Sequence, residues 1–131
     1  MRTMTYRKAI IEALNEEMGK DPSIFIMGED IGKHWQGSVK EFEGVWHKFG
    51  SQRIRETPIS ETAIMGCAIG AAVTGMRPIA NIMFANFLTV PMDEIYNQMT
   101  KMRYMFGGKT KMPVTIICLS GAGLGAAAQH S

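Results

Sequence analysis

The chain has 131 residues, of which 46% are hydrophobic and 20% charged, a composition typical of one soluble globular domain. Its 14 Lys and Arg residues and 12 Asp and Glu residues leave a net charge of +2. Because these charges are spread along the chain, they exclude the clustered basic surface of a nucleic-acid-binding protein. The longest weakly charged run, residues 62–76, falls short of the roughly 20 apolar residues that a membrane span needs.

The start of the chain and the cysteines predict a cellular compartment. Residues 1–5 lead into an amphipathic pattern without the apolar core of a secretion signal. Cys67 and Cys118 lie far apart in apolar stretches and lack the spacing of a metal site or a disulfide framework. We therefore expect a cytoplasmic protein with buried, reduced thiols.

The first half of the chain predicts a helix, a buried strand and a loop. Apolar residues recur at three- and four-residue steps from residue 6 to 18 after a candidate N-cap at Thr5, which indicates an amphipathic helix. Residues 24–27 are wholly apolar, as in a strand buried on both faces of a parallel sheet. Residues 32–52 show no sustained period, so we predict a loop with room for one helical turn.

The second half alternates in the same way. Residues 53–56 predict a short strand, and residues 57–60 a turn into a helix with Glu61 in its first turn. The following strand, helical stripe and strand are predicted at residues 79–84, 92–106 and 114–119. This alternation predicts an α/β fold with a doubly wound, mainly parallel sheet and helices on both faces, in three layers.

Glu61 is the first candidate for acid–base chemistry. The dipole at a helix start favours its charged form, whereas burial against Ile59, Ile64 and Met65 would raise its pKa. These opposed effects predict a carboxyl group that exchanges a proton near neutral pH. The alternative from position alone is an ordinary residue at a solvent-exposed helix start.

A glycine-rich turn and three histidines are further candidates. Gly121, Gly123 and Ala126 follow a predicted strand with the spacing of a dinucleotide-binding turn. That motif belongs to the first strand of such folds, so a structural turn is the alternative reading. His34, His47 and His130 show no metal-ligand spacing.

Seven ordered blocks carry a resemblance that covers the whole chain. They are residues 28–32, 48–50, 53–61, 70–72, 77–79, 103–108 and 127–131. Together they resemble the β subunit of a thiamine-diphosphate-dependent E1 component from the acetoin, pyruvate or branched-chain 2-oxo acid dehydrogenase complexes. Residues 103–109 and 121–124 look most like the acetoin branch.

The resemblance implies a thiamine-diphosphate-binding, transketolase-like fold and a division of labour between subunits. Residues 1–131 correspond to the pyrimidine-binding domain, so we expect a truncated β subunit that lacks the family's C-terminal domain. In the family, a Gly-Asp-Gly motif of the α subunit marks the site of the diphosphate and Mg²⁺. This chain has no such motif, so we expect the α subunit to hold both groups and expect no metal ligands in this chain. We expect an α2β2 heterotetramer that serves a lipoyl-bearing E2 and is inactive as this chain alone.

The resemblance also assigns the site residues. Glu61 would hydrogen-bond the N1′ atom of the aminopyrimidine, promoting the tautomer that deprotonates the thiazolium C2. Phe87 would stack on the aminopyrimidine ring, and His130 would transfer protons or assist acylation of the lipoyl group. Ile59 and Glu29 are expected in the cofactor region, and Glu29 also follows a strand at the edge where open α/β sheets bind ligands.

The implied activity is cleavage of a C–C bond next to a carbonyl in acetoin or a 2-oxo acid such as pyruvate. The acyl unit would pass to lipoyl-E2. The sequence departs from the family at Asn81, where relatives usually carry glutamate, and within residues 33–43, which leaves the small-molecule substrate open. Two alternatives remain: a non-catalytic interaction fragment, and a nicotinamide-dependent oxidoreductase that rests on the glycine-rich turn alone.

Overall fold

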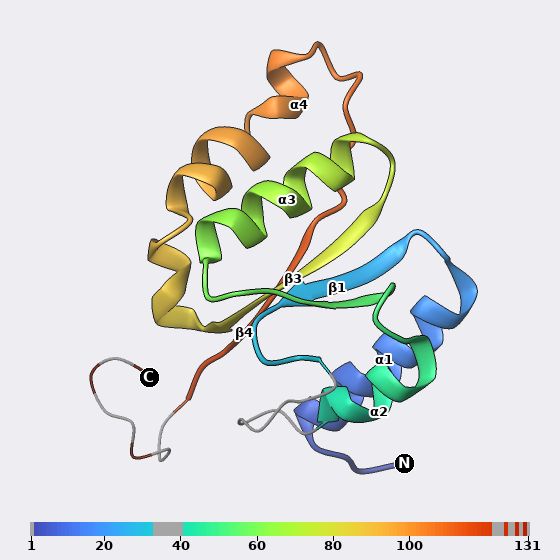
Figure 1. Cartoon of the computed structure of the whole chain (residues 1–131). Helices are drawn as coiled ribbons and strands as arrows, with labels where there is room; N and C mark the ends of the chain where they lie inside the picture. Colours follow the sequence, from blue (N-terminus) through green and yellow to red (C-terminus); the bar gives the residue numbers. More distant parts are fainter. Residues whose placement is uncertain (1, 33–40, 122–124, 126–127, 129, 131) are drawn as a thin grey trace.

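The fold is a four-stranded parallel sheet with helices on both faces (Figure 1). The structure, a computed structural model, describes all residues except 1, 33–40, 122–124, 126–127, 129 and 131. Within the described residues the strand order is β2-β1-β3-β4. This arrangement confirms the predicted α/β fold.

Strand β1 (Ile24–Gly28) lies inside the sheet, and all of its residues are buried. It pairs on one side with β2 (Ile54–Glu56) and on the other with β3 (Arg77–Phe84). Strand β4 (Thr115–Leu119) lies beyond β3, and its residues are half-buried or exposed. A wholly apolar strand therefore sits where helices cover both faces, as its composition predicted.

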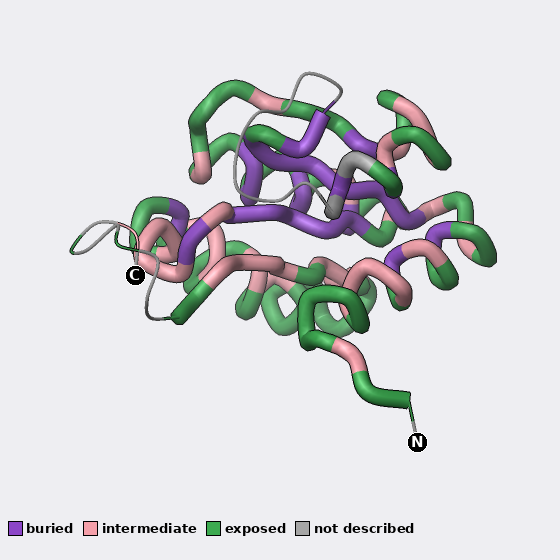
Figure 2. Tube along the Cα trace, turned by 90° about the horizontal axis from the view of Figure 1, so that it is seen from below, coloured by how far each residue is buried: buried purple, intermediate pink, exposed green. Residues whose placement is uncertain are grey.

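Two apolar clusters hold the helices against the sheet, and Figure 2 shows that the buried residues follow the inner segments of the fold. Helices α1 (Tyr6–Lys20) and α2 (Glu41–Phe49) pack on one face through Leu14, Met18 and Val45. Helix α3 (Glu61–Val73) and the π-helical η2 (Glu94–Met99) cover the other face. The molecule is thus built in three layers, as expected for a doubly wound sheet.

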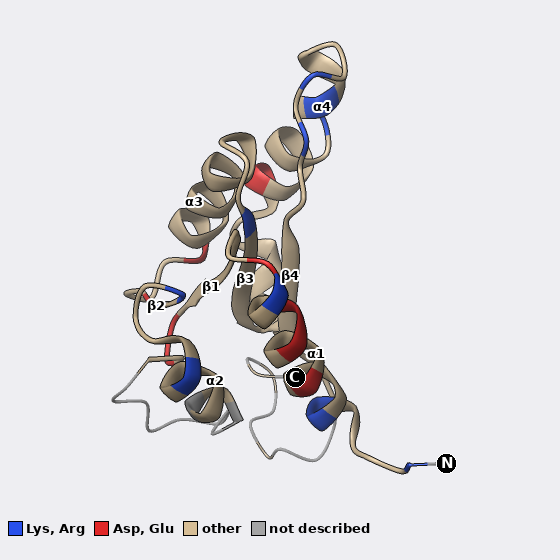
Figure 3. Ribbon diagram, turned by 90° about the vertical axis from the view of Figure 1, so that its right-hand side faces the viewer, with Lys and Arg blue, Asp and Glu red and all other residues tan. Residues whose placement is uncertain are grey.

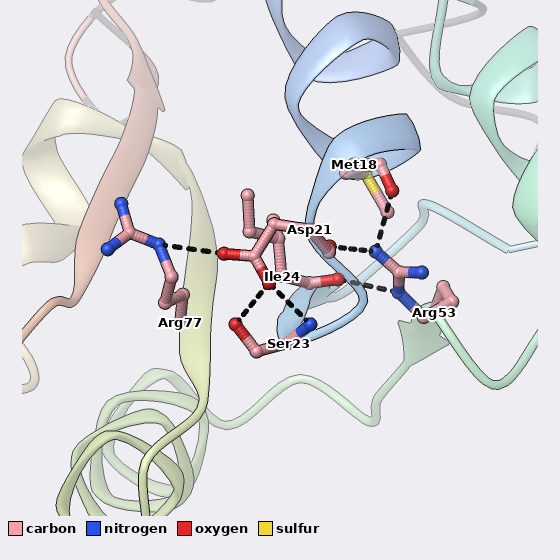
Figure 4. A network of polar contacts seen from close by, with 6 residues as sticks. All are labelled: Met18, Asp21, Ser23, Ile24, Arg53 and Arg77. Atoms are coloured by element: carbon pink, nitrogen blue, oxygen red, sulfur yellow. Dashed lines mark hydrogen bonds and ion pairs between the residues drawn. The ribbon is translucent and has the colours of Figure 1, made fainter.

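Arg53 connects the end of α1 to the start of β1 and β2 (Figure 4). Its guanidinium donates to the carbonyl oxygens of Met18, Asp21 and Ile24 at 3.1, 2.9 and 2.6 Å. The Asp21 carboxylate accepts bonds from the hydroxyl and backbone N–H of Ser23, and these bonds, with weaker help from Arg77 and Arg53, lower the pKa of Asp21. This polar network closes the N-terminal end of the strands.

The loop predicted over residues 32–52 is wrong for its second half. Helix α2 occupies Glu41–Phe49, whereas residues 33–40 lie outside the described part of the chain. The apolar side chains of α2 follow helical spacing and pack in one cluster with Leu14 and Met18 of α1; they are Phe42, Val45, Trp46 and Phe49. The helix is only nine residues long and contains Gly44, so its apolar period is weak in the sequence.

The helix predicted over residues 92–106 is interrupted. The chain forms the 3-10 segment η1 (Ala85–Thr89), then η2, then the short α4 (Met102–Met105). The Thr100 N–H donates to the Ile95 carbonyl five residues back, and the Thr100 hydroxyl donates to Tyr96. These bonds widen the turn, since the hydroxyl competes for a helix carbonyl.

The cysteines are free, but the prediction that both thiols are buried is wrong. Cys67 is exposed on α3, and Cys118 is half-buried on β4. In the described part of the chain, no helix is long and apolar enough to cross a membrane. A cytoplasmic location stays a prediction.

Candidate functional site

The predicted site residues gather at the C-terminal end of the sheet. Glu29 follows β1, Thr57 follows β2, and Glu61 begins α3. The Thr57 N–H donates to the Gly28 carbonyl at 2.9 Å, which fixes the turn before Glu61 beside the turn that holds Glu29. Parallel strands end at one edge, so three separate segments meet where such sheets bind ligands.

Glu29 is a buried carboxyl group, with only 7% of the residue exposed. Burial raises its pKa above the ordinary value of 4.5, and the negative charges of Glu61 and Asp30 raise it further. Asp30 turns the chain away from β1 with a φ of 50°. Glu29 therefore retains a proton more readily than an ordinary carboxylate, and it senses the charge of Glu61.

Glu61 is the first residue of α3 and is half-buried. The N-cap Ser60 makes no side-chain capping bond, and Glu61 is the acidic residue of the first turn, where the helix dipole favours negative charge. The expected burial against Ile59 is wrong, because Ile59 is 81% exposed. Ile64 and Met65 are buried, since they point toward the sheet.

Phe87 and His130 come together at the end of β3, although 43 positions separate them in the sequence. Their ring centroids lie 5.3 Å apart, with the ring planes nearly perpendicular at 85°. Phe84 lies against both rings, 5.9 Å from Phe87 and 4.8 Å from His130. We name Phe84, Phe87 and His130 the aromatic trio.

The site residues thus form two groups at the ends of neighbouring strands. Glu29 and Glu61 interact at the end of β1, and the aromatic trio lies at the end of β3, which pairs with β1. In Figure 3, acidic positions after β1 and at the start of α3 share this end of the sheet, whereas Lys and Arg gather around α4 at the other end. Basic positions on α1 and α2 also lie at this end, so Glu29 and Glu61 form an acidic pair within a surface of mixed charge.

Two further side chains of this region, Phe84 and Thr57, were not predicted from the sequence. Phe84 is the last residue of a predicted strand, and its spacing of three residues from Phe87 is the signal in the sequence that could have identified it. Thr57 has a buried hydroxyl oxygen without a hydrogen-bond partner among the described residues. Buried polar atoms normally have a hydrogen-bond partner, so the Thr57 hydroxyl is a candidate for contact with a ligand at this edge.

The outer face of α3 is open. A Cβ atom added at Gly66 or Gly70 would meet no atom within 4 Å. Both glycines line a groove of about 560 Å³ between α3 and η2, together with Val73, Gln98 and Phe106 among others. These glycines leave space outside the domain and do not relieve crowding within its core.

The predictions about Mg²⁺ and nicotinamide binding stay predictions. No group of three or more His, Cys, Asp and Glu side chains among them could hold a metal ion. The proposed dinucleotide turn at Gly121–Ala126 lies mostly outside the described residues. Neither Mg²⁺ binding by a partner nor nicotinamide binding is tested by this geometry.

Comparison with protein families identifies one domain over nearly the entire chain. A family model described as transketolase, pyrimidine binding domain, matches residues 2–131. The acetoin:2,6-dichlorophenolindophenol oxidoreductase subunit beta of Cupriavidus necator is 48% identical, covering 99% of this chain and 41% of that protein. The corresponding Bacillus subtilis subunit is 41% identical over the same shares.

Further relatives belong to pyruvate dehydrogenase. The human mitochondrial E1 component subunit beta is 40% identical and covers 98% of this chain, which spans 35% of that subunit. A solved structure described as split gene transketolase, inactive beta4 tetramer, superposes with a TM-score of 0.60 at 26% identity. That comparison covers 84% of this chain and 32% of the other. The chain therefore spans about two fifths or less of these relatives.

Proposed function

The chain belongs to the transketolase pyrimidine-binding domain family, and from this membership we propose that it is part of the β subunit of a thiamine-diphosphate-dependent E1 component. Residues 1–131 would form its pyrimidine-binding domain. The proposed reaction cleaves a C–C bond next to a carbonyl and delivers the acyl unit to a lipoyl group on E2. The observation that carries the proposal is the match of residues 2–131 to the family model, with Glu61 at the start of α3 beside a buried second carboxyl.

The residues at the C-terminal end of the sheet fit an aminopyrimidine. Glu61 offers a half-buried carboxylate to a ring nitrogen, and exposed Ile59 offers an apolar contact beside it. Phe87 offers a half-buried ring to a flat heterocycle. When bound, thiamine diphosphate would supply the carbanion and the electron sink that C–C cleavage requires.

Glu61 would act by sharing a proton with the bound pyrimidine. A carboxylate that hydrogen-bonds a ring nitrogen promotes protonation there. Glu29 would limit the negative charge at this edge, since burial and the neighbouring charges favour its protonated form. We assign Glu61 the catalytic role and Glu29 a supporting role in the cofactor region.

His130 is the second proposed catalytic residue. An imidazole changes charge near neutral pH and can donate or accept a proton without large cost. Its contact with Phe87 places it beside the proposed pyrimidine platform. It would therefore move protons at the substrate side of the site during acyl transfer to the lipoyl group.

We propose that an α subunit completes the site by holding the diphosphate and Mg²⁺, in an α2β2 assembly. The open glycine face of α3 supports close helix packing against a partner, because nothing lies within 4 Å of an added Cβ at Gly66 or Gly70. A structural relative is described as an inactive β4 tetramer, which supports the expectation that β chains of this kind associate but need a partner for activity.

Acetoin is the substrate we favour, because both bacterial relatives named above are acetoin oxidoreductase subunits. The test is reconstitution of a β subunit of the relatives' length, containing this chain, with its α subunit. Dye reduction is then measured with acetoin, pyruvate and branched-chain 2-oxo acids. Turnover of acetoin supports the proposal. If none of the three substrates is turned over with thiamine diphosphate, the non-catalytic alternative is favoured. If this chain binds NAD(H), the nicotinamide alternative is favoured.

A further inference from the structure

Strand β3 contains an irregularity next to the aromatic trio. Asn81 pairs with Ile117 and Phe84 pairs with Leu119, so β3 advances three residues while β4 advances two. This extra residue is a β-bulge. Within it, Met83 has a φ of 46°, a left-handed conformation that non-glycine residues rarely adopt.

The bulge decides the face of the sheet on which Phe84 lies. Side chains alternate along a strand, so residues 81 and 84 of a regular strand would point to opposite faces. The extra residue breaks this alternation before Phe84, which pairs with Leu119 and turns its ring toward Phe87 and His130. Removal of one residue would turn Phe84 to the other face.

Phe84 is buried, yet its packing is unlike that of the other core residues. It is 9% exposed but belongs to neither of the two large apolar clusters formed by the described residues. Its ring instead meets the His130 imidazole at 4.8 Å and 86° and the Phe87 ring at 5.9 Å and 83°. Each pair is edge-to-face, an attractive arrangement that depends on orientation.

We propose that Phe84, directed by the bulge at Met83, is a positioning residue that holds the His130 imidazole against Phe87. Two perpendicular rings define both the place and the tilt of the imidazole, because a rotation of His130 would lose both edge-to-face contacts. Backbone strain near a functional site is maintained only where the surroundings enforce it. Here the strained residue directly precedes the phenylalanine that contacts His130.

The positioning of His130 by Phe84 follows from the geometry, whereas its catalytic value rests on the function proposed above for His130. Two separate measurements distinguish them. The first observes the imidazole in the chain itself and requires neither cofactor nor turnover. The second observes turnover in the assembled enzyme.

Proton NMR of the chain reports on the position of the imidazole. His130 resonances are assigned by comparison with His130→Gln, because the chain contains three histidines. We expect nuclear Overhauser effects from the imidazole protons to both phenylalanine rings. Phe84→Leu should abolish the effect between His130 and Phe87, whereas Phe25→Leu, which alters a buried phenylalanine of β1, should preserve it.

Deletion of Met83 tests the role of the bulge. The deletion should turn Phe84 away and abolish the nuclear Overhauser effect between His130 and Phe87. In contrast to Phe84→Leu, Phe84→Tyr should retain this effect, because the tyrosine keeps the ring edge. Thermal unfolding verifies that each variant is folded. An intact Phe87–His130 effect in folded Phe84→Leu overturns the proposal.

Turnover of the assembled enzyme then tests the function. Phe84→Leu should lower kcat up to about a hundredfold with KM unchanged, the scale expected for a displaced catalytic group. Phe84→Tyr should recover it. Phe84→Leu and His130→Gln can both leave kcat unchanged even though Phe84→Leu displaces the imidazole. In that case the positioning role of Phe84 stands, and the proposed catalytic role of His130 is refuted.

Discussion

Gly28 and Asn81 lie in register on neighbouring strands with no room for a side chain between them. A Cβ atom on Gly28 would lie 2.6 Å from the Asn81 carbonyl oxygen and 2.8 Å from its Cβ. We predict that Gly28→Ala separates β1 from β3 and costs about 1–3 kcal/mol in the free energy of unfolding, the usual range for overpacking. Urea unfolding followed by circular dichroism measures the loss.

Gly19→Ala is the matched control for that substitution. Gly19 lies in α1 with nothing within 4 Å of an added Cβ. Alanine there should stabilise the chain by roughly 0.5–1 kcal/mol through its better helix propensity. Equal effects of the two substitutions would contradict the close approach of the strands.

Glu61→Gln should abolish turnover of the assembled enzyme while leaving assembly nearly intact. The amide keeps the shape of the side chain but cannot share a proton with a ring nitrogen, so we expect a loss on the order of a hundredfold or more. Steady-state kinetics and sedimentation measure the two properties. The control Glu16→Gln alters an exposed carboxylate of α1; near-normal turnover of Glu61→Gln would refute the catalytic assignment.

Glu29 should make stability fall as the pH rises. Its pKa in the folded chain lies above 4.5, so the folded state binds the proton more tightly than the unfolded state does. Ionisation of Glu29 therefore disfavours folding, and the cost develops as the pH passes from 4.5 through the folded pKa. Glu29→Gln should be more stable relative to wild type at pH 7 than at pH 4.

Urea unfolding at both pH values tests this linkage. Glu16→Gln provides the comparison, because it replaces an exposed carboxylate of α1 by the same amide. A Glu29→Gln variant whose relative stability is the same at the two pH values would show that ionisation of Glu29 has no effect on folding.

Gly70→Leu should weaken association with the α partner without destabilising the chain alone. The new side chain would project into open space above α3, and leucine favours helix more than glycine does. Sedimentation of the complex and thermal unfolding of the chain measure both effects, with Gly19→Leu in α1 as control. An intact complex with a lowered melting temperature would place Gly70 within the core instead.

The chain alone should not bind thiamine diphosphate tightly. The proposed site of this chain would contact only the pyrimidine, and no cluster of acidic, histidine or cysteine side chains among the described residues could hold a metal ion. Calorimetric titration with thiamine diphosphate and Mg²⁺ measures the affinity. Micromolar binding without an α subunit would overturn the proposed division of the site.

Long periodic elements of the fold were predictable from local sequence. Helix α1 and strands β1 and β3 follow directly from their apolar patterns, and Thr5 caps α1 by accepting a bond from the Lys8 N–H at 3.2 Å. Helix α2 and the break before α4 were not predicted. A short helix depends on packing more than on propensity, and the π-helical turn depends on where the Thr100 hydroxyl bonds.

The candidate site was predictable only where residue type and position coincide. Glu61 at a helix start and Glu29 after a strand could be found from the sequence and the family resemblance. The bulge that orients Phe84 could not, because it arises from the register between β3 and β4. The raised pKa of Glu29 likewise depends on burial and on a neighbour 32 positions away in the sequence.

The three carbonyl oxygens held by Arg53 belong to α1, to the turn after it and to β1, whereas the guanidinium comes from a residue that precedes β2. A chimaera that takes its first 24 residues from a relative therefore inherits a turn shaped for a donor encoded elsewhere. Recombination between related chains should tolerate crossovers between residues 24 and 53 only when both parents carry arginine at the latter position. The polar network around Arg53 therefore restricts which segments can be exchanged, although it lies at the end of the sheet opposite the proposed chemistry.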